Sequence, residues 1–278
     1  MRGLITILAA SLLTCAGAVP VAAQAPAQAE ISLWRLDCGE IHVGDLDSFS
    51  DAYLYEGQEK TLTDSCYLIR HGDRYLLWDT GLPGELAGQT VEDGGYRMTL
   101  RERIRDQLGR IGVRPDQINF VGISHYHDDH VGQAADFPGA TLVIGAADWE
   151  AIRNRPETAA RFQPWIAGGA AVEAVARDHD VFGDGSVVVL DMPGHTPGHH
   201  SLLVRLRGRA PVLLTGDLFH FTEQVGNGGV PRFNTNRADT LASIARFLAI
   251  ADSLEAEMII QHEPDDVAKL PAFPEAAH

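Results

Sequence analysis

The sequence predicts a single α/β domain, and three observations support this. Short apolar segments rich in β-branched residues recur along the chain, and helical patterns with apolar residues three and four positions apart lie between some of them. No Pro- or Ser-rich linker interrupts residues 24–278. With 45% apolar side chains, the chain can bury a sizeable core. Together these features indicate one domain of about 250 residues.

The expected elements follow from these patterns. We expect strands at residues 31–37, 66–79 with a turn at His-Gly-Asp, 118–124, 141–145, 186–192, 201–208, 211–217 and 257–262. The clearest helical patterns cover residues 98–112 and 237–254. Residues 41–64 and 221–236 are expected to be long loops, which at that length often carry function.

Residues 1–23 have the layout of a secretory signal peptide. Arg2 precedes an apolar run that ends in small residues, and we expect cleavage after Ala23. A retained membrane anchor is disfavoured because the run is short, contains Pro20 and lacks a basic stop sequence. Lipid attachment at Cys15 is disfavoured by the residue before it. The mature chain, residues 24–278, is therefore expected in the periplasm or outside the cell.

Charge and cysteine content limit the partners. Cleavage changes the formal net charge from −16 to −17, which disfavours nucleic acid or an anionic membrane surface as a partner. Solubility explains this charge better than steering of cationic substrates. Cys38 and Cys66 remain after cleavage; a disulfide and two separate buried thiols are both compatible with the sequence. The oligomeric state stays open, with a homodimer possible.

The stretch SHYHDDHVG, residues 124–132, indicates a metal site. His125 and His127 leave the end of an expected strand, where alternate residues share a face. Asp129 and His130 follow where an aspartate-rich turn starts a helix. A solvated histidine-rich loop is disfavoured because this HxHxDH pattern rarely occurs by chance. Four ligand-type side chains can thus converge at one strand end.

Three later residues share the same setting, each directly after an apolar strand: His195, Asp217 and His262. Seven ligands exceed what one tetrahedral ion takes, so two divalent ions are expected. With Asp217 bridging them, one ion takes His125, His127 and His195, and the other takes Asp129, His130 and His262. Zinc suits this thiolate-free set, although manganese, iron or cobalt also fit it.

These motifs resemble a known superfamily. HxHxDH, PGHTPGH, TGD and a histidine after a strand are similar to the two-metal branch of the metallo-β-lactamase fold superfamily. DCG, SCYLIRHGDRYLLWDTGLP, HTPGHHSL, TGDLFHF and IIQH resemble the N-acyl-homoserine lactonase family over roughly residues 33–262. The resemblance implies an αββα sandwich, in which two mixed β-sheets lie face to face with helices outside and the metals lie at one edge.

The resemblance also implies an activity. Lactonases of this kind open the lactone ring of N-acyl-homoserine lactones, which quenches quorum signals, by attack of a metal-bridging hydroxide. Asp129 then binds metal and protonates the leaving alcohol. His220 stands where some members carry a tyrosine that holds the substrate carbonyl, and an imidazole can donate one hydrogen bond there. An ordinary loop histidine is equally compatible with the sequence, and this departure from the family pattern leaves the exact substrate open. Asp79 is expected to hold a ligand histidine from behind; an ordinary turn-capping role is equally compatible.

The sequence also offers residues for a substrate groove and several histidines outside the metal motifs. A groove for the acyl chain is expected from aromatic side chains, with plain packing as the alternative: Phe49, Tyr53, Tyr55, Phe162 and Trp165, with Leu46 and Leu54 beside them. One of His199 and His200 is expected to begin the next strand and the other to support the site. Four histidines outside every motif are expected at the surface: His42, His71, His179 and His278.

Three other functions compete with lactone hydrolysis. Export favours a metallo-β-lactamase, but the bridging Asp217 disfavours it. GDLFH also resembles exported organophosphate and aryl-ester hydrolases of the superfamily. A non-catalytic metal-binding protein is disfavoured, because a structural site needs about four ligands and closes every coordination position.

Overall fold

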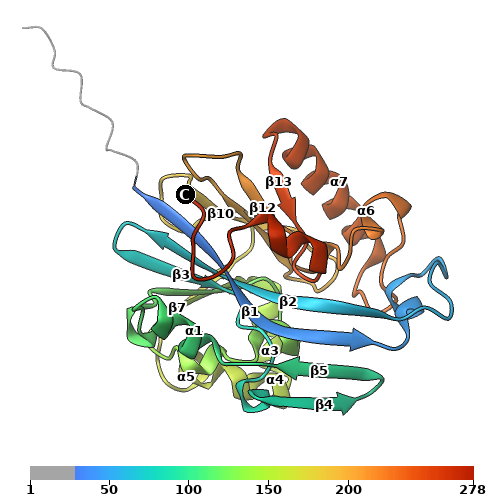
Figure 1. The fold of residues 1–278 in the computed structure, drawn as a ribbon, viewed down its shortest axis with the longest axis horizontal. Coiled ribbons are helices and arrows are strands. Elements are labelled where there is room, and N and C mark those ends of the chain that lie inside the picture. The colour runs from blue at the N-terminus through green and yellow to red at the C-terminus, as the bar shows by residue number, and fades with distance from the viewer. Residues whose placement is uncertain (1–28) are drawn as a thin grey trace, which may run out of the picture.

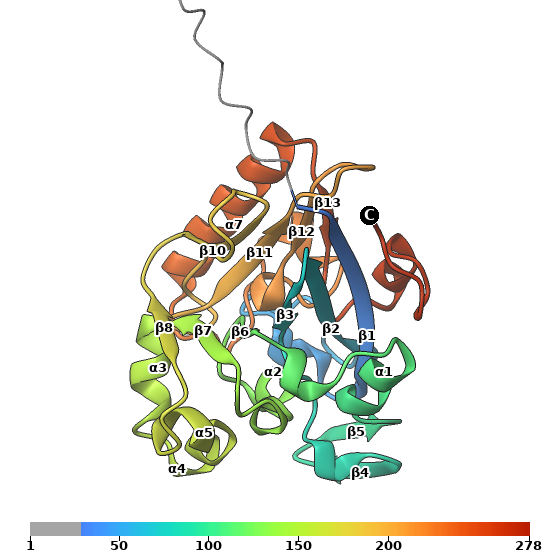
Figure 2. The ribbon, with the colours of Figure 1, turned by 90° about the vertical axis from the view of Figure 1, so that its left-hand side faces the viewer.

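The computed structural model describes residues 29–278, so the expected signal peptide lies outside the described residues. Two β-sheets lie face to face in it, with helices on both outer faces (Figure 1, Figure 2). This is the αββα sandwich that the sequence resemblance implied. Within residues 29–278 no helix is both long enough and apolar enough to span a bilayer.

The larger sheet has eight strands in the order β4-β5-β1-β2-β3-β6-β7-β8. Its strands are β1 (Ile31–Val43), β2 (Lys60–His71), β3 (Arg74–Trp78), β4 (Gln89–Asp93), β5 (Tyr96–Leu100), β6 (Phe120–Ile123), β7 (Thr141–Gly145) and β8 (Val172–Val175). The smaller sheet has the order β13-β12-β11-β10-β9. Its strands are β9 (His179–Asp180), β10 (Val187–Asp191), β11 (His200–Val204), β12 (Val212–Leu214) and β13 (Glu257–Ile259).

The helices are short except for the last one. They are α1 (Ile104–Arg110), α2 (Asp128–Val131), α3 (Ala146–Ile152), α4 (Pro156–Ala159), α5 (Gln163–Ile166), α6 (Gln224–Asn227) and α7 (Arg237–Ser253). Helix α7 begins where the Asn236 side chain accepts hydrogen bonds from the backbone N–H groups of Ala238 and Asp239. Such a cap satisfies amide groups that have no partner inside the helix.

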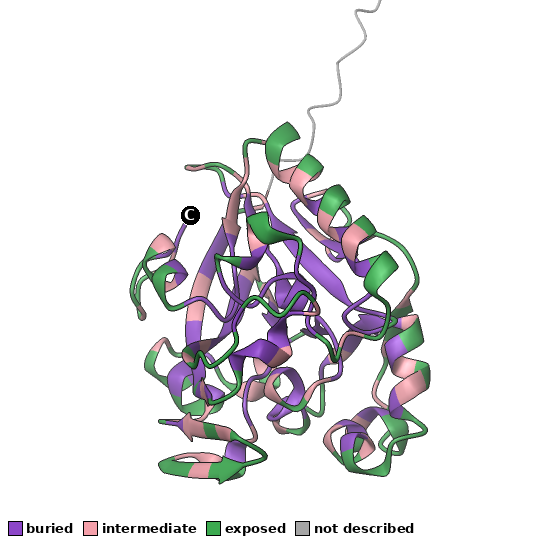
Figure 3. Ribbon diagram, turned by 90° about the vertical axis from the view of Figure 1, so that its right-hand side faces the viewer, coloured by how far each residue is buried: buried purple, intermediate pink, exposed green. Residues whose placement is uncertain are grey.

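Alternation along the strands produces the layers. In β2, Tyr67 and Ile69 face the smaller sheet, whereas Leu68 faces the helical side with α1. In β12, Leu214 packs between the sheets, whereas Leu213 contacts the layer that includes Phe247 of α7. Successive side chains of a strand point to opposite faces, so a sheet covered on both sides is apolar at every position. Buried strands accordingly lie inside the exposed outer faces of the helices (Figure 3).

The structure corrects three sequence-based predictions. The helix expected over residues 98–112 starts only at Ile104, because Met98 lies in β5, where its neighbours across the sheet are Ile41 and Val91. The loop expected over residues 41–64 is shorter, since β1 and β2 pair from both ends into this range. His71 is buried rather than at the surface, with its Nε2 2.8 Å from Asp184 Oδ2.

Strand direction brings the predicted ligands together. Strands β3, β6 and β7 run parallel in the larger sheet. In the smaller sheet β12 is parallel to β13, and β10 shares that direction because both β10 and β12 pair antiparallel to β11. Residues that follow parallel strands meet at one edge of a sheet. The segments after β3, β6, β10, β12 and β13 carry the candidate site.

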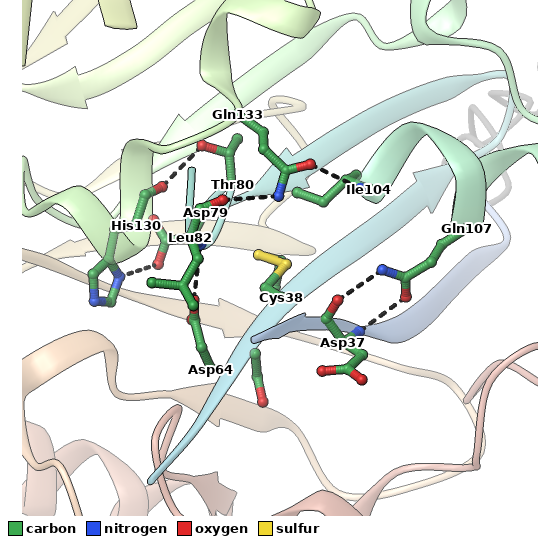
Figure 4. Close-up of a disulfide and its surroundings, with 12 residues drawn as sticks. Asp37, Cys38, Asp64, Asp79, Thr80, Leu82, Ile104, Gln107, His130 and Gln133 are labelled. Atoms are coloured by element: carbon green, nitrogen blue, oxygen red, sulfur yellow. Dashed lines mark hydrogen bonds and ion pairs between the residues drawn. A yellow bond between two sulfur atoms is a disulfide. The ribbon is translucent and has the colours of Figure 1, made fainter. Parts of the chain in front are cut away.

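A disulfide joins Cys38 of β1 to Cys66 of β2, with the two Cα atoms 5.8 Å apart (Figure 4). It resolves the alternative that the sequence left open. Gly81 lies against it with φ +62°, and a Cβ added there would come within 2.4 Å of the Cys38 Cβ. The carbonyl oxygen of Gly81 accepts a hydrogen bond from the backbone N–H of Gly132, the residue directly after α2. The disulfide therefore packs against the loop that contacts the C-terminal end of α2.

Replacing both cysteines, Cys38→Ala with Cys66→Ala, is expected to lower the free energy of unfolding by about 2–4 kcal/mol, because the crosslink restricts the unfolded chain. Urea denaturation of both proteins measures this difference. Alkylation of the denatured, unreduced wild-type chain is the control. Uptake of two alkyl groups by Cys38 and Cys66 would show free thiols and contradict the disulfide.

Candidate metal centre

Two groups of ligand-type side chains converge where the sheets meet. The first ligand set, His125, His127 and His195, surrounds Asp217. His195 Nε2 lies 3.2 Å from His125 Nε2 and 3.0 Å from His127 Nδ1. Asp217 Oδ2 lies 3.3 Å from His195 Nε2 and 3.6 Å from His125 Nε2. Four donor atoms from three separate segments thus face one point.

The second ligand set consists of Asp129, His130 and His262. His130 Nε2 and His262 Nε2 lie 3.2 Å apart. Asp217 Oδ1 lies 3.1 Å from the first of these atoms and 3.0 Å from the second. Asp129 approaches the same two nitrogens at 3.9 and 3.8 Å. The two oxygens of Asp217 therefore face different ligand sets, which is the arrangement of a bridging carboxylate.

The donor distances fit a pair of metal ions. Ligand bonds of about 2.0–2.1 Å in a tetrahedral site place donor atoms roughly 3.3 Å apart. The spacings of 3.0 to 3.6 Å around the first ligand set match this value. The donors are imidazole and carboxylate, and the disulfide removes both nearby cysteines from coordination. The predicted partition of seven ligands between two ions therefore agrees with the geometry.

The carboxylate of Asp79 holds the second ligand set from behind. It follows β3 with φ 57° and is fully buried. Its Oδ1 accepts a hydrogen bond from Ser124 N at 2.7 Å. Its Oδ2 accepts from Ser124 Oγ and from Gln261 Nε2, and lies 3.0 Å from His130 Nδ1. This network fixes the His130 ring with Nε2 toward the metal point, in the way that outer partners orient metal-bound histidines.

Other outer contacts orient the remaining ligands. His195 Nδ1 lies 2.8 Å from Asn234 Oδ1, and His262 Nδ1 lies 2.9 Å from the carbonyl oxygen of Thr63.

His199 accepts a hydrogen bond at Nε2 from Asp217 N, and its Nδ1 faces the Met192 carbonyl. Burial lowers the pKa of His199 to about 4, so the ring is neutral and can accept this bond. His199 thus supports the bridging aspartate, while His200 begins β11 as expected.

A second buried carboxylate, Asp148 of α3, supports the first ligand set. It accepts hydrogen bonds from Thr196 Oγ1 at 2.7 Å and from Gly198 N at 2.6 Å. Burial raises its pKa to about 6, and these two hydrogen bonds act against that rise. The contacts anchor the loop that carries His195 to the helical layer outside the larger sheet.

The two ligand sets differ in protonation. Burial lowers the pKa of His125 and His195 well below the usual range, so these imidazoles are neutral. Burial also acts on His262, but the Asp217 carboxylate outweighs it and raises the pKa of His262 to about 9. The pKa of His130 is likewise held well above its usual value by neighbouring carboxylates against the effect of burial. An ion entering the second ligand set must therefore displace protons.

The two residues predicted to act on substrate lie beside the ligands. Asp129 is partly exposed and borders a cavity of about 640 Å³. His220 lines the same cavity, with Nε2 3.1 Å from Asp217 Oδ2. Its buried Nδ1 has no hydrogen-bond partner among the described residues. The Phe49 ring packs edge-on against His220 at 4.9 Å between centroids.

The cavity corrects most of the predicted acyl groove. Of the aromatic residues proposed for it, Phe49 lines the cavity. Phe162 and Trp165 belong to the core on the helical side of the larger sheet. Tyr55 packs on Phe221, and Tyr53 is 70% exposed. The apolar wall comes instead from residues that the sequence did not single out: Ile41, Val43, Leu62, Leu82, Leu86, Tyr96, Met98 and Phe233.

Several supporting residues were missed by sequence reasoning. Ser124 and Gln261 each directly precede a predicted ligand, so their position next to His125 and His262 was an available signal. Asn234 and Asp148 lie far along the chain from the ligands they support. Only the packing of loops against each other brings them close, and no local pattern in the sequence marks them.

The fold and this site define a class, the metallohydrolases with an αββα sandwich and a histidine- and aspartate-rich site for two metal ions. The chain belongs to the metallo-beta-lactamase superfamily, whose family model matches residues 61–262. It is 31% identical over 226 residues to the N-acyl homoserine lactonase AttM of Agrobacterium fabrum, an alignment that covers 68% of this chain and 82% of that protein.

Solved structures agree with this assignment. An N-acyl homoserine lactone hydrolase with the product N-hexanoyl-L-homoserine bound at its catalytic metal centre superposes with a TM-score of 0.75. A mutant of Bacillus thuringiensis AiiA with N-decanoyl-L-homoserine at the active site also gives 0.75. Each is 26% identical in sequence, and each comparison covers 90% of this chain and 100% of the other.

Asp79→Asn is expected to weaken metal binding at the second ligand set about 10- to 100-fold, because the amide nitrogen cannot accept the hydrogen bonds that orient His130. Titration against a chromophoric chelator resolves two dissociation constants and should show one of them raised. Asp184→Asn, which removes a carboxylate far from the ligands, is the control. Two unchanged constants in the Asp79 variant would contradict this role.

Asp148→Asn is expected to weaken metal binding at the first ligand set by a similar factor of about 10 to 100. An asparagine side chain can accept from Thr196 or from Gly198 but cannot accept equally from both, so the His195 loop loses one anchor. The same chelator titration checks this result. A loss at the second ligand set alone would contradict the assignment.

Proposed function

We propose that this protein is an exported, two-metal hydrolase that opens the lactone ring of N-acyl-homoserine lactones. The observation that carries the proposal is the position of Asp217, whose two oxygens face separate ligand sets at the floor of a cavity with an apolar wall. The relatives named above, which are lactonases, support the choice of substrate.

Two metal ions held by the two ligand sets and Asp217 would supply a nucleophilic hydroxide near neutral pH and would polarise the substrate carbonyl. The chain provides the rest. His220 lines the cavity beside Asp217 and is assigned to hold the substrate carbonyl, while the Phe49 ring packs edge-on against its imidazole. Asp129, partly exposed at the cavity, accepts the proton released by the attacking oxygen and delivers it to the ring oxygen as the C–O bond of the lactone breaks. The product is the open N-acyl-homoserine.

The cavity supports an acyl chain on the substrate. A volume of about 640 Å³ lies within the range of small-molecule sites, and its wall carries Ile41, Val43, Leu62 and Met98. The solved relatives hold products with hexanoyl and decanoyl chains. We assign the metals as zinc, since imidazole and carboxylate without thiolate suit this ion.

Export and a small-molecule substrate complete the proposal. The leader at residues 1–23 and the Cys38–Cys66 disulfide both favour an oxidising compartment, the periplasm or the exterior. The acidic chain remains a poor partner for nucleic acid or anionic membranes. Among the alternatives, an organophosphate or aryl-ester hydrolase shares the bridging aspartate, whereas a β-lactamase does not.

The deciding experiment is pH-stat hydrolysis, by zinc-loaded protein, of hexanoyl- and decanoyl-homoserine lactones beside a carbapenem and an aryl phosphotriester. Lactone kcat/KM is expected to exceed that of the other two by at least about 100-fold, a difference of some 3 kcal/mol in transition-state stabilisation. Chelated protein is the control. Faster turnover of the carbapenem or phosphotriester would transfer the assignment to that substrate.

Asp129→Asn is expected to lower kcat for the lactones by about 10²- to 10⁴-fold, since the amide cannot protonate the leaving oxygen. The metal content of each preparation must be measured alongside, because Asp129 is also a ligand. Asp252→Asn, which changes an exposed carboxylate on α7 outside the cavity, is the matched control. Full turnover by a metal-replete Asp129 variant would remove this residue from acid catalysis.

A further inference from the structure

Outside the two ligand sets and Asp217, every charged side chain that lines the cavity is a carboxylate. Besides the ligands Asp129 and Asp217 at its floor, three carboxylates line it: Glu85, Asp93 and Asp128. None of the described residues that line this cavity is a lysine or an arginine. Such a lining repels an anionic substrate electrostatically but does not repel a neutral one.

The three carboxylates come from separate elements around the opening. Glu85 lies in the 3-10 helix Gly84–Leu86, Asp93 ends β4, and Asp128 begins α2. All three are exposed to solvent. The apolar wall from β1, β2 and β5 lies in the same cavity as the ligands and these carboxylates. A substrate whose carbonyl is at the ligands therefore directs its tail along this wall and past the acidic residues.

Cations close to this rim are sparse. Arg161 pairs with Glu85 through two hydrogen bonds of 2.6 and 3.1 Å and does not itself line the cavity. In residues 29–278, neither Asp93 nor Asp128 makes an ion pair with a basic side chain. Arg161 also acts electrostatically on Asp128, so its charge offsets part of the field of Glu85 and Asp128, whereas Asp93 has no basic ion-pair partner among the described residues.

We propose that this acidic rim, Glu85, Asp93 and Asp128, selects lactones and esters whose tail is neutral or cationic and rejects tails that end in a carboxylate, sulfate or phosphate. The inference rests on the proposed function for the identity of the reacting group. A like charge held beside these carboxylates in a cleft is repelled, and none of the described residues that line the cavity is basic. The substrate class is therefore a neutral or cationic amphiphile.

A series of homoserine lactones with acyl tails of equal length tests the proposal. The tails end in a methyl, a carboxylate or a trimethylammonium group, and kcat/KM is measured at low and high ionic strength. At low salt the carboxylate-ended compound is expected to react about 10-fold more slowly than the methyl-ended one, a gap that narrows as salt screens the exposed rim. The trimethylammonium compound should equal or exceed the methyl compound.

Charge reversal on the rim provides the second arm. Asp93→Lys should bring the carboxylate-ended and methyl-ended compounds to within about threefold of each other, and Asp93→Asn should give an intermediate gap. Asp252→Lys is the matched control, because Asp252 is an exposed carboxylate on α7, outside the cavity. It changes the net charge equally and should leave the gap as in the wild type.

The two proposals fail in different ways. If the wild type hydrolyses the neutral and carboxylate-ended lactones equally, the rim is no filter although the lactonase function stands. If no lactone reacts, the proposed function fails, and p-nitrophenyl esters of the same three acids then test the rim. Equal rates across those esters, or no turnover of either series, would overturn the filter as well. A changed gap in the Asp252 variant would also overturn it, since net charge alone would then be sufficient.

Discussion

The shared carboxylate of Asp217 is the constraint on which the rest of this structure depends. It is nearly inaccessible to solvent, and burying a charge is tolerable only when opposite charge or hydrogen bonds surround it. Imidazoles of both ligand sets face its two oxygens, and the backbone N–H of Asp217 donates a hydrogen bond to His199. The strand β12 delivers Asp217 to the edge where both sheets end, so the sandwich itself determines where two positive ions can be held.

Support for the two ligand sets is divided between two buried aspartates. Asp79 follows β3 and holds His130, whereas Asp148 belongs to α3 and holds the loop of His195. Gly81 and Gly132 allow the backbone behind α2 to approach the disulfide-linked strands more closely than any side chain permits. The geometry of the two ligand sets thus depends on residues outside them, as is common for metal sites built on rigid elements.

The sequence predicted which side chains the structure brings together in two groups, because each follows an apolar strand and parallel strand ends meet at one edge. It failed where tertiary packing alone decides. Phe162 and Trp165 are residue types that could line a groove, but they lie in the core. Met98 fits a helical pattern, but it belongs to a strand that forms the cavity wall. Neither burial nor facing direction can be read from residue type when both environments are apolar.

Each ligand set draws on both sheets. His125, His127, Asp129 and His130 follow β6 of the larger sheet, whereas His195, Asp217 and His262 follow strands of the smaller one. A metal ion held by either ligand set would therefore also link the two halves of the sandwich. Because ligands that bind only the folded state stabilise it by mass action, the resistance of this protein to unfolding would then rise with the free metal concentration of its surroundings. A chain built this way would depend on its environment for its cohesion.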